Sequence, residues 1–362
     1  MQYRTIGASG VKLSCISLGG MRIPTDRGVS EEQAIATVRR AIELGVNYLE
    51  TAPGYGNSEV LIGKALEDGW RDRTYVSTKS HTASAREMRK ALEKSMERLR
   101  VDKVDFYHMW YVCNNADWSD VMKKGGSLDG AKQARDEGLI DHIGITTHAP
   151  IALVREMVTC GEYELVTITY NAANREYEEI IELAGENDVG VVIMNPLAGG
   201  MLANAPAGTD GAKRPRPHIM AALGFLLAQP AITTAICGAK SPEEIEEDVA
   251  AGEFVPGEAG QAAAAALEEA GVDFCTTCGY CMPCAEGVDI PQAMLNWNYL
   301  RLYDMDFSKW TAEARERLRG VVAFEKCIEC GQCLDKCPNS LPIIDRLREL
   351  ESVLDAADAA RD

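Results

Sequence analysis

The sequence lacks any apolar run long enough to cross a lipid bilayer. Its longest run, Ile219–Ala228, falls well short of the roughly 20 residues that a transmembrane helix needs. The N-terminus, Met1–Thr5, also lacks the hydrophobic segment of a secretory signal. These absences argue against a membrane protein and predict a cytoplasmic one.

Basic charge is also scarce. The 37 Lys and Arg residues are outnumbered by 55 Asp and Glu residues, which gives a formal net charge of −18. Nucleic acids and anionic membranes attract basic surfaces, so neither is expected as a partner. With 46% hydrophobic residues the chain is expected to fold. Its 362 residues exceed one typical core, so one large domain and one smaller domain are expected.

Cysteine, in contrast, is abundant, and most of it falls in two runs near the C-terminus. The runs read C-x2-C-x2-C-x2-C and C-x2-C-x2-C-x3-C-P, and their members are Cys275, Cys278, Cys281, Cys284, Cys327, Cys330, Cys333 and Cys337. Triples of this spacing bind three corners of an iron–sulphur cube, whereas structural zinc is held by paired C-x2-C knuckles. The spacing therefore predicts two [4Fe-4S] clusters.

The fourth cysteine of such a run usually binds the other cluster. The first run closes as C-x2-C and lacks the C-x3-C-P ending of the second, so the exchange of Cys284 and Cys337 between clusters is a hypothesis. Two clusters imply that electrons move through the protein. We therefore expect a ferredoxin-like or flavodoxin-like electron partner.

Before the cysteine runs, short apolar strands alternate with amphipathic helices. Three of the helices open with capping boxes, at Ser30–Gln33, Ser84–Glu87 and Ser241–Glu244. Eight strand–helix units over about 250 residues are typical of a (β/α)8 barrel. The competing doubly wound sheet carries a G-x-G-x-x-G motif after its first strand, which is missing here. We predict an α/β TIM barrel over residues 1–256 and a small, mainly helical ferredoxin-like domain over residues 257–362.

The active site of such a barrel lies at the C-terminal ends of its strands. The second strand ends at Glu50 and is followed by Tyr55, and the third ends at Lys79. A lysine in a barrel mouth needs a carboxylate partner, which Glu50 can supply. An ammonium beside a phenol favours the ionised form, so Tyr55 can donate and accept a proton. These three residues predict an acid–base relay.

The motifs around these residues resemble the aldo-keto reductase family, and specifically its branch with a C-terminal two-cluster ferredoxin-like domain. They cover nearly the whole chain and comprise Gly45–Glu59, Ile62–Leu66, Ser77–Lys79, Ile143–Ile145, Pro196–Gly200 and both cysteine runs. The resemblance implies a barrel that binds NAD(P)H at its mouth and passes hydride to a carbonyl group, using a tetrad of Asp, Tyr, Lys and His. The matching positions are Glu50, Tyr55, Lys79 and Trp110.

Two of these positions depart from the family. Glu50 keeps the charge but is longer by one methylene, and the indole of Trp110 cannot polarise a carbonyl group as an imidazole does. His108 lies two residues earlier and faces the same side of the strand, one layer deeper. It stays a catalytic candidate, although we favour its interpretation as a hydrogen-bonded histidine inside the barrel.

Other residues at the mouth are candidates for binding substrate. His81 and His148 follow other strands, and Tyr111 extends an aromatic wall that Tyr55 and Trp110 begin. We predict that His81, His148 and Tyr111 contact the substrate, and for each histidine a purely structural role is an equal alternative. The aromatic wall favours a small, apolar or aromatic carbonyl compound or alcohol.

The resemblance also locates the cofactor. Where the family commonly holds the adenosine 2′-phosphate with Arg and often Asn, this chain has Glu244 and Asp248, which repel a phosphate. NAD(H), or no nicotinamide at all, is therefore favoured over NADP(H). The helix N-terminus nearby can still hold an anion. The predicted cofactor-binding residues are Thr146, Leu197, Gly199, Gly200, Gly238, Lys240 and Ser241.

The leading hypothesis is an iron–sulphur oxidoreductase whose clusters relay electrons. Because Trp110 replaces the family histidine and the phosphate site is acidic, a redox-neutral lyase, dehydratase or isomerase is an alternative, as is a reductase fed only through its clusters. A third alternative is a non-catalytic module that senses redox state. The retention of Tyr55 and Lys79 argues against that module.

Overall fold

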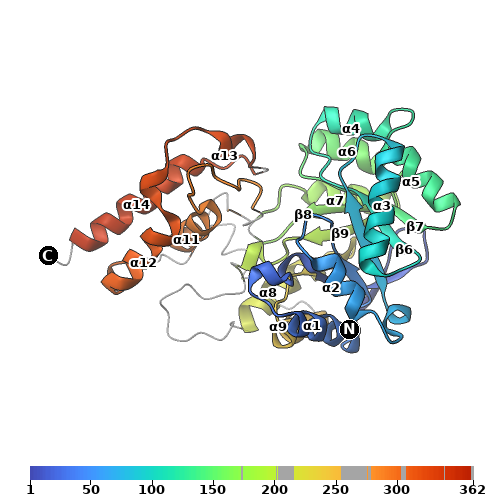
Figure 1. Ribbon diagram of the computed structural model, residues 1–362, viewed down its shortest axis with the longest axis horizontal. Coiled ribbons are helices and arrows are strands. Elements are labelled where there is room, and N and C mark those ends of the chain that lie inside the picture. The colour runs from blue at the N-terminus through green and yellow to red at the C-terminus, as the bar shows by residue number, and fades with distance from the viewer. Residues whose placement is uncertain are drawn as a thin grey trace. The chain divides into compact units, whose positions relative to one another are not determined.

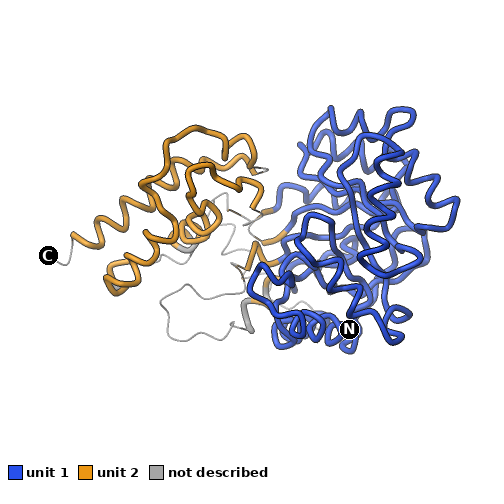
Figure 2. Tube along the Cα trace, viewed as in Figure 1, with its two compact units in different colours: residues 1–170, 175–196, 223–257 blue, residues 171–174, 197–222, 258–362 orange. Residues whose placement is uncertain are grey.

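The computed structural model describes residues 1–172, 174–200, 202, 216–253, 275, 279–302, 307–337 and 339–359. The chain forms two compact units (Figure 2). The first contains residues 1–170, 175–196 and 223–257, and the second contains residues 171–174, 197–222 and 258–362. The predicted domain boundary after residue 256 lies outside the described residues and stays a prediction.

The first unit is a closed barrel of eight parallel strands in the order β10-β3-β4-β5-β6-β7-β8-β9 (Figure 1). The predicted (β/α)8 fold is confirmed. The strands are β3 (Ile16–Gly19), β4 (Tyr48–Glu50), β5 (Tyr75–Ser80), β6 (Val104–Met109), β7 (Ile140–Thr146), β8 (Leu165–Thr169), β9 (Gly190–Met194) and β10 (Ile232–Cys237).

An N-terminal hairpin precedes the barrel and packs against its interior. Strands β1 (Tyr3–Thr5) and β2 (Lys12–Ser14) pair antiparallel. Ile6 and Leu13 from this hairpin are buried in one apolar cluster with barrel residues such as Tyr48 and Phe106. The interior is therefore a packed core, which confines polar chemistry to the ends of the strands.

Helices surround the strands of the barrel (Figure 1). In the first part of the chain they are α1 (Glu31–Glu43), α2 (Ser58–Ala65), α3 (Ala85–Leu99), α4 (Asn115–Met122), α5 (Ser127–Asp136), α6 (Ile151–Thr159), α7 (Glu178–Glu186), α8 (Arg216–Leu227) and α9 (Pro242–Ala250). The predicted N-terminal caps are confirmed: the side chains of Ser30, Ser84 and Ser241 each accept the N–H of the residue three positions later.

Two local features differ from the sequence-based expectation. Helix α4 was not predicted. It begins where the Asn114 side chain accepts the N–H groups of Ala116 and Asp117. Because Val121 is its one buried residue, the sequence shows almost no helical periodicity of apolar residues there. Strand β6 ends at Met109, so Trp110 begins the following loop rather than ending the strand. Its N–H still donates to the carbonyl oxygen of Ser80, 2.9 Å away.

The second unit is helical, as predicted. Its described helices are α11 (Ile290–Leu302), α12 (Ala312–Val322), α13 (Gln332–Asp335) and α14 (Ile343–Ala359). Trp297 on α11 is buried, donates its indole N–H to Glu349 at 2.7 Å and carries the Arg346 guanidinium 3.9 Å from its ring centroid. Helices α11 and α14 are thereby joined beside the cysteine loops. Among the described residues, no helix has the length and hydropathy to span a membrane.

Candidate active site and metal centre

A buried lysine occupies the mouth of the barrel. Lys79, 3% exposed, lies near the end of β5. Its ammonium forms an ion pair with Glu50 at the end of β4 and donates to the carbonyl oxygen of Thr51 at 3.0 Å. Burial lowers the pKa of Lys79 well below its usual value, whereas the adjacent carboxylate favours the charged form. Each charge depends on the other, because removal of one leaves the second buried without a partner.

Tyr55 and Trp110 lie beside this ion pair. The Lys79 Nζ atom is 4.6 Å from the centroid of the Tyr55 ring and 5.9 Å from that of the Trp110 ring. The two rings meet edge to face, with centroids 6.0 Å apart. The structure thus brings together all four positions that the resemblance matches to the family tetrad, although one of them carries an indole.

Gly54, which the sequence analysis did not single out, makes room for that indole. A Cβ atom on residue 54 would lie 2.5 Å from Cη2 of Trp110, closer than any real contact. The indole therefore rests directly on the backbone that leads to Tyr55. A glycine between Pro53 and Tyr55 indicates that another group can approach the backbone closely at residue 54. The sequence could not show that this group is the indole of Trp110.

His108 lies below the mouth, in the barrel interior. It is 2% exposed, and its Nε2 is 3.2 Å from the hydroxyl of Tyr48, which donates in turn to Ser77 at 2.9 Å. A Cβ atom on Gly144 would lie 2.4 Å from Nδ1, so backbone covers the other side of the ring. Burial, with the Lys79 charge second, lowers the pKa of His108 to about 3. This geometry fits the structural interpretation of a neutral barrel histidine.

The candidate substrate residues form a row of rings along the mouth. The His81 and Tyr111 ring centroids are 6.4 Å apart, and those of Tyr111 and His148 are 6.0 Å apart. His81 Nδ1 is 2.9 Å from the carbonyl oxygen of Trp110. Burial lowers the pKa of His148 to about 4, so that ring is neutral at ordinary pH. Of the two histidines, only His81 is exposed.

The predicted cofactor residues fall into three groups. Thr146 ends β7, and its hydroxyl accepts the N–H of Tyr111 at 3.0 Å. Leu197, Gly199 and Gly200 lie at turn η4 (Ala198–Gly200), where both glycines have positive φ; these residues belong to the second unit. Gly238, Lys240 and Ser241 lie between β10 and α9 in the barrel.

The N-terminus of α9 is capped by Ser241, and the carboxylate of Glu244 lies beside this cap. Glu244 accepts the N–H of Lys240 at 2.9 Å, and the hydroxyl of Ser241 accepts the N–H of Glu244 at 3.4 Å. Arg22, which the sequence analysis missed, lies across Gly238, where a Cβ atom would be 2.8 Å from the Arg22 Cδ. The sequence could have indicated Arg22, because it lies just after the first barrel strand, where such barrels place their active sites. The carboxylate of Glu244 and the guanidinium of Arg22 thus both lie near the residues that join β10 to α9.

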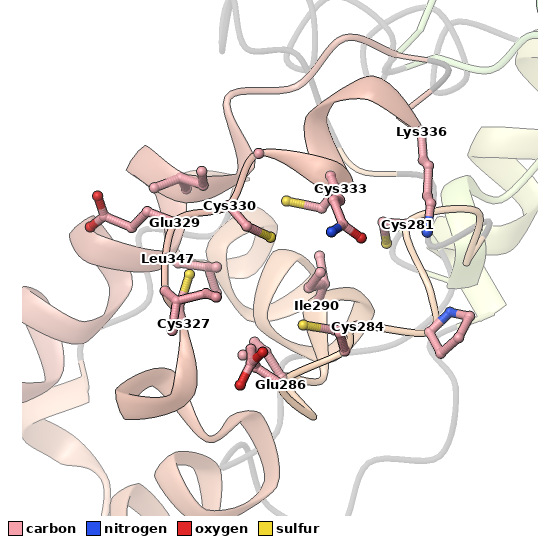
Figure 3. A pocket seen from close by; sticks show the side chains of 17 residues that line it. Cys281, Cys284, Glu286, Ile290, Cys327, Glu329, Cys330, Cys333, Lys336 and Leu347 are labelled. Atoms are coloured by element: carbon pink, nitrogen blue, oxygen red, sulfur yellow. The ribbon is translucent and has the colours of Figure 1, made fainter.

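The cysteine runs meet in the second unit. Five of their members line one cavity, together with the apolar side chains of Ile290 and Leu347. These cysteines are Cys281, Cys284, Cys327, Cys330 and Cys333 (Figure 3). No group of three or more His, Cys, Asp or Glu side chains in the described ranges is spaced to hold a single metal ion. The sulphur atoms instead border a shared space.

Cys284 is electrostatically coupled to the second run. Burial raises the pKa of Cys333, and the nearby Cys327, Cys330 and Cys284 raise it further. Figure 3 shows these four sulphur atoms facing one another across the cavity. Four thiols around one cavity are the donor set of an iron–sulphur cluster.

Two other members of the runs, Cys275 and Cys337, are described but do not line this cavity. The side-chain amide of Asn298 on α11 holds the backbone of Cys275, accepting its N–H at 3.1 Å and donating to its carbonyl oxygen at 2.8 Å. Cys337 is described but is not among the residues that line the cavity. Cys278 lies outside the described residues.

Comparison with known proteins accounts for both units. The sequence pattern of the aldo/keto reductase family matches residues 15–266. The chain belongs to the aldo/keto reductase family. A 4Fe-4S dicluster domain matches residues 274–341, so this aldo/keto reductase is an oxidoreductase that carries an iron–sulphur domain. The predicted family and its iron–sulphur branch are confirmed.

Similar proteins include L-galactose dehydrogenase of Arabidopsis thaliana, which is 27% identical over 69% of this chain and 88% of its own length. NADH-specific methylglyoxal reductase of Escherichia coli is 25% identical over 69% of this chain and 93% of its own length. The holo form of aldo-keto reductase AKR11C1 from Bacillus halodurans superposes with a TM-score of 0.63 at 25% identity, covering 74% of this aldo/keto reductase and 96% of that chain.

The contact between Gly54 and Trp110 can be measured as a coupling energy. We expect Gly54→Ala to lower the free energy of unfolding of the barrel by about 1–3 kcal/mol, because the new methyl group overlaps the indole. In a Trp110→Ala background the same change should cost less than about 0.5 kcal/mol. Denaturant titrations of the four proteins, followed by circular dichroism, measure both costs. Equal costs in the two backgrounds would contradict the contact.

Proposed function

We propose that this aldo/keto reductase interconverts a small carbonyl compound and its alcohol, with Tyr55 as the group that gives or takes the proton. In the direction of reduction, the carbonyl carbon receives a hydride equivalent and the oxygen receives the proton from the Tyr55 hydroxyl. The observation that carries this proposal is the Lys79 ammonium 4.6 Å from the Tyr55 ring, in contact with the Glu50 carboxylate.

The buried ion pair explains how Tyr55 can act as the proton donor or acceptor. The ammonium stabilises the phenolate that remains after the proton leaves, and the carboxylate keeps that ammonium charged despite its burial. Trp110 has no proton to move at the carbonyl oxygen, but its ring packs edge to face against Tyr55. In this proposal, Trp110 shapes the site and His108 supports the barrel.

NAD(H) suits this barrel better than NADP(H). When bound, the reduced nicotinamide supplies the hydride. Glu244 already accepts the backbone N–H of Lys240, and its negative charge opposes a 2′-phosphate at that place. We propose that Thr146, Gly238 and Ser241 contact the dinucleotide, and that the Arg22 guanidinium, lying across Gly238, pairs with its pyrophosphate. Lys240 is exposed and adds a further cation.

For the iron–sulphur domain we propose that the cluster ligands are exchanged between the runs. Cys327, Cys330, Cys333 and Cys284 would hold one cluster. All four line the same cavity, as Cys281 also does, and Cys327, Cys330 and Cys284 are the thiols close enough to raise the pKa of Cys333. The other would be held by Cys275, Cys278, Cys281 and Cys337. Clusters in this domain supply one-electron transfer, which couples the barrel to a ferredoxin-like or flavodoxin-like partner.

A reductase fed only through its clusters is the second candidate, because Trp110 stands where the family has its histidine. Visible absorption spectra of the anaerobic holoenzyme distinguish the two. We expect NADH to bleach the iron–sulphur absorption and NADPH to do so far less, because of the charge of Glu244. A spectrum that neither nucleotide changes would overturn the nicotinamide part of the proposal and favour the cluster-fed reductase.

Removal of the Tyr55 hydroxyl tests the proton role. We expect Tyr55→Phe to lower turnover at least about 100-fold, since general acid catalysis is typically worth that much or more. The phenyl ring keeps its packing on Trp110 and Lys79, so NADH affinity should not change. Suitable probes are methylglyoxal and L-galactose, taken from the names of the similar enzymes.

A matched control for this variant is Tyr75→Phe, because Tyr75 packs on Phe106 in the barrel with ring centroids 5.9 Å apart, away from the ion pair. It should retain full turnover. The test uses a probe that the wild type turns over. If Tyr55→Phe turns it over at an undiminished rate, Tyr55 is not the proton donor.

The exchange of ligands predicts how iron content responds to paired substitutions. Cys284→Ala should lower the iron content from about eight atoms per chain to about four, because one [4Fe-4S] cluster is lost. Cys284→Ala with Cys330→Ala should also keep about four, since both residues serve the same cluster. Cys160→Ala, at the end of α6, is the control and should keep all the iron. Loss of all iron in the Cys284/Cys330 double variant would contradict the exchange.

A further inference from the structure

The most exposed large apolar side chain in the described ranges lies beside a proposed cluster ligand. Ile328 follows Cys327 in the second cysteine run and is 65% exposed. Leu334, on α13, follows Cys333 in the same run and is 37% exposed. Single apolar residues are common on protein surfaces, so the surroundings of this pair decide what their exposure means.

The segment Cys327–Leu334 borders both solvent and the cavity that five cysteines line. Ile328 is exposed and also lines that cavity, and Cys330 is the one exposed cysteine among the described residues. Figure 3 shows the Cys330 sulphur atom pointing into the cavity, whereas the carboxylate of Glu329 points away from it. A cluster held by the proposed ligands would therefore lie close to the surface at this segment.

An ion pair holds the turn that carries Ile328. Glu329 has a φ of 56°, in the left-handed region, and Gly331 follows with a φ of 79°. The Arg348 guanidinium on α14 contacts both carboxylate oxygens of Glu329, and its Nε donates to Oε1 at 2.9 Å. Two contacts from a planar guanidinium fix the orientation of a carboxylate as well as its position. The turn is thus tied to α14, and Ile328 is held at the surface.

The charged side chains beside the apolar pair are of both signs. Glu329 is paired with Arg348. The exposed charged residues that flank the segment or lie within a turn of it are Glu325, Lys326, Asp335 and Lys336. Apolar side chains within a rim of mixed charge are the usual composition of a protein–protein contact. An acidic partner is therefore repelled less here than the net charge of −18 would suggest.

The proposed cluster beneath this segment indicates which partner would use it. Electron transfer slows steeply as the distance between donor and acceptor grows, so a carrier must bind where the cluster lies near the surface. Weakly bound redox pairs bury little surface, so a contact of this size is sufficient. The benzenoid edge of a flavin is apolar and suits contact with Ile328 and Leu334.

We propose that the segment Cys327–Leu334 is the docking surface for a small flavin-bearing electron carrier of the flavodoxin type. One electron leaves the reduced cluster and enters the flavin, so the cluster is oxidised by one electron and the flavin is reduced by one. The proton that the flavin takes up comes from water, and no other bond changes. This inference rests on the proposed ligand assignment and electron partner, and it names where that partner binds.

Electron transfer to flavodoxin tests the docking surface without substrate or NADH. The anaerobic holoenzyme is reduced with dithionite, freed of the excess and mixed with oxidised flavodoxin in a stopped-flow instrument. The red absorption of the flavin semiquinone reports each electron that arrives. Hexaammineruthenium(III), a small one-electron oxidant that needs no docking surface, serves as the reference acceptor. A failure of the Tyr55 or NADH proposals leaves this measurement unaffected.

We expect Ile328→Gln and Leu334→Gln each to slow the second-order transfer to flavodoxin roughly tenfold, because each removes an apolar contact. Transfer to the ruthenium complex should stay unchanged. Leu334 does not line the cavity, so its variant tests docking even if Ile328→Gln loses iron. Ile328→Leu should keep the wild-type rate. The matched control is Val321→Gln on α12, which is 49% exposed and does not line the cavity, and it should also keep that rate.

Several outcomes overturn the proposal. One is an undiminished flavodoxin rate in both glutamine variants, and another is an equal slowing with flavodoxin and with the ruthenium complex, which would place the effect on the cluster. A wild type that passes electrons to the ruthenium complex or to an oxidised ferredoxin, but not to flavodoxin, excludes the flavin carrier. Sedimentation tests a second copy as the occupant: a wild-type dimer that Ile328→Gln converts to a monomer, at an unchanged flavodoxin rate, assigns the surface to self-association.

Discussion

The desolvated ammonium of Lys79 constrains every group around the barrel mouth. An isolated charge at this depth would be costly, and the structure surrounds it with a carboxylate, a backbone carbonyl oxygen and the faces of two aromatic rings. Glu50 and the ring of Tyr55 both contact this ammonium. The proposed proton transfer from Tyr55 depends on the same arrangement.

Trp110 contacts other residues of the barrel mouth beside this ion pair. It needs Gly54 beneath it, since any side chain there would overlap the ring. Its carbonyl oxygen, which points away from the ring, holds the imidazole of His81. The loss of a histidine at one position is thus accompanied by an oriented histidine from the neighbouring strand end.

The cavity of the iron–sulphur unit is built from different residues than the barrel mouth. Its cavity is lined by thiols, by apolar side chains such as Ile290 and by charged ones such as Lys336. Burial raises the pKa of Cys333, and the neighbouring thiols raise it further. An iron–sulphur cluster relieves this by binding the thiolate forms. Helices α11 and α14 hold the loops from outside, through Asn298 on the backbone of Cys275 and through the contacts of Trp297.

The amino-acid sequence alone determined the barrel, the helical caps, the family and the iron–sulphur domain, because each depends on local patterns: short apolar strands that alternate with helices, capping boxes and C-x2-C triples. It also indicated Glu50, Tyr55 and Lys79, since parallel strands bring their ends to one edge. The tertiary structure decided what spacing cannot encode. That Gly54 lies under Trp110, that Arg22 lies across Gly238 and that a backbone carbonyl orients His81 are contacts between separate loops, which depend on how the barrel closes.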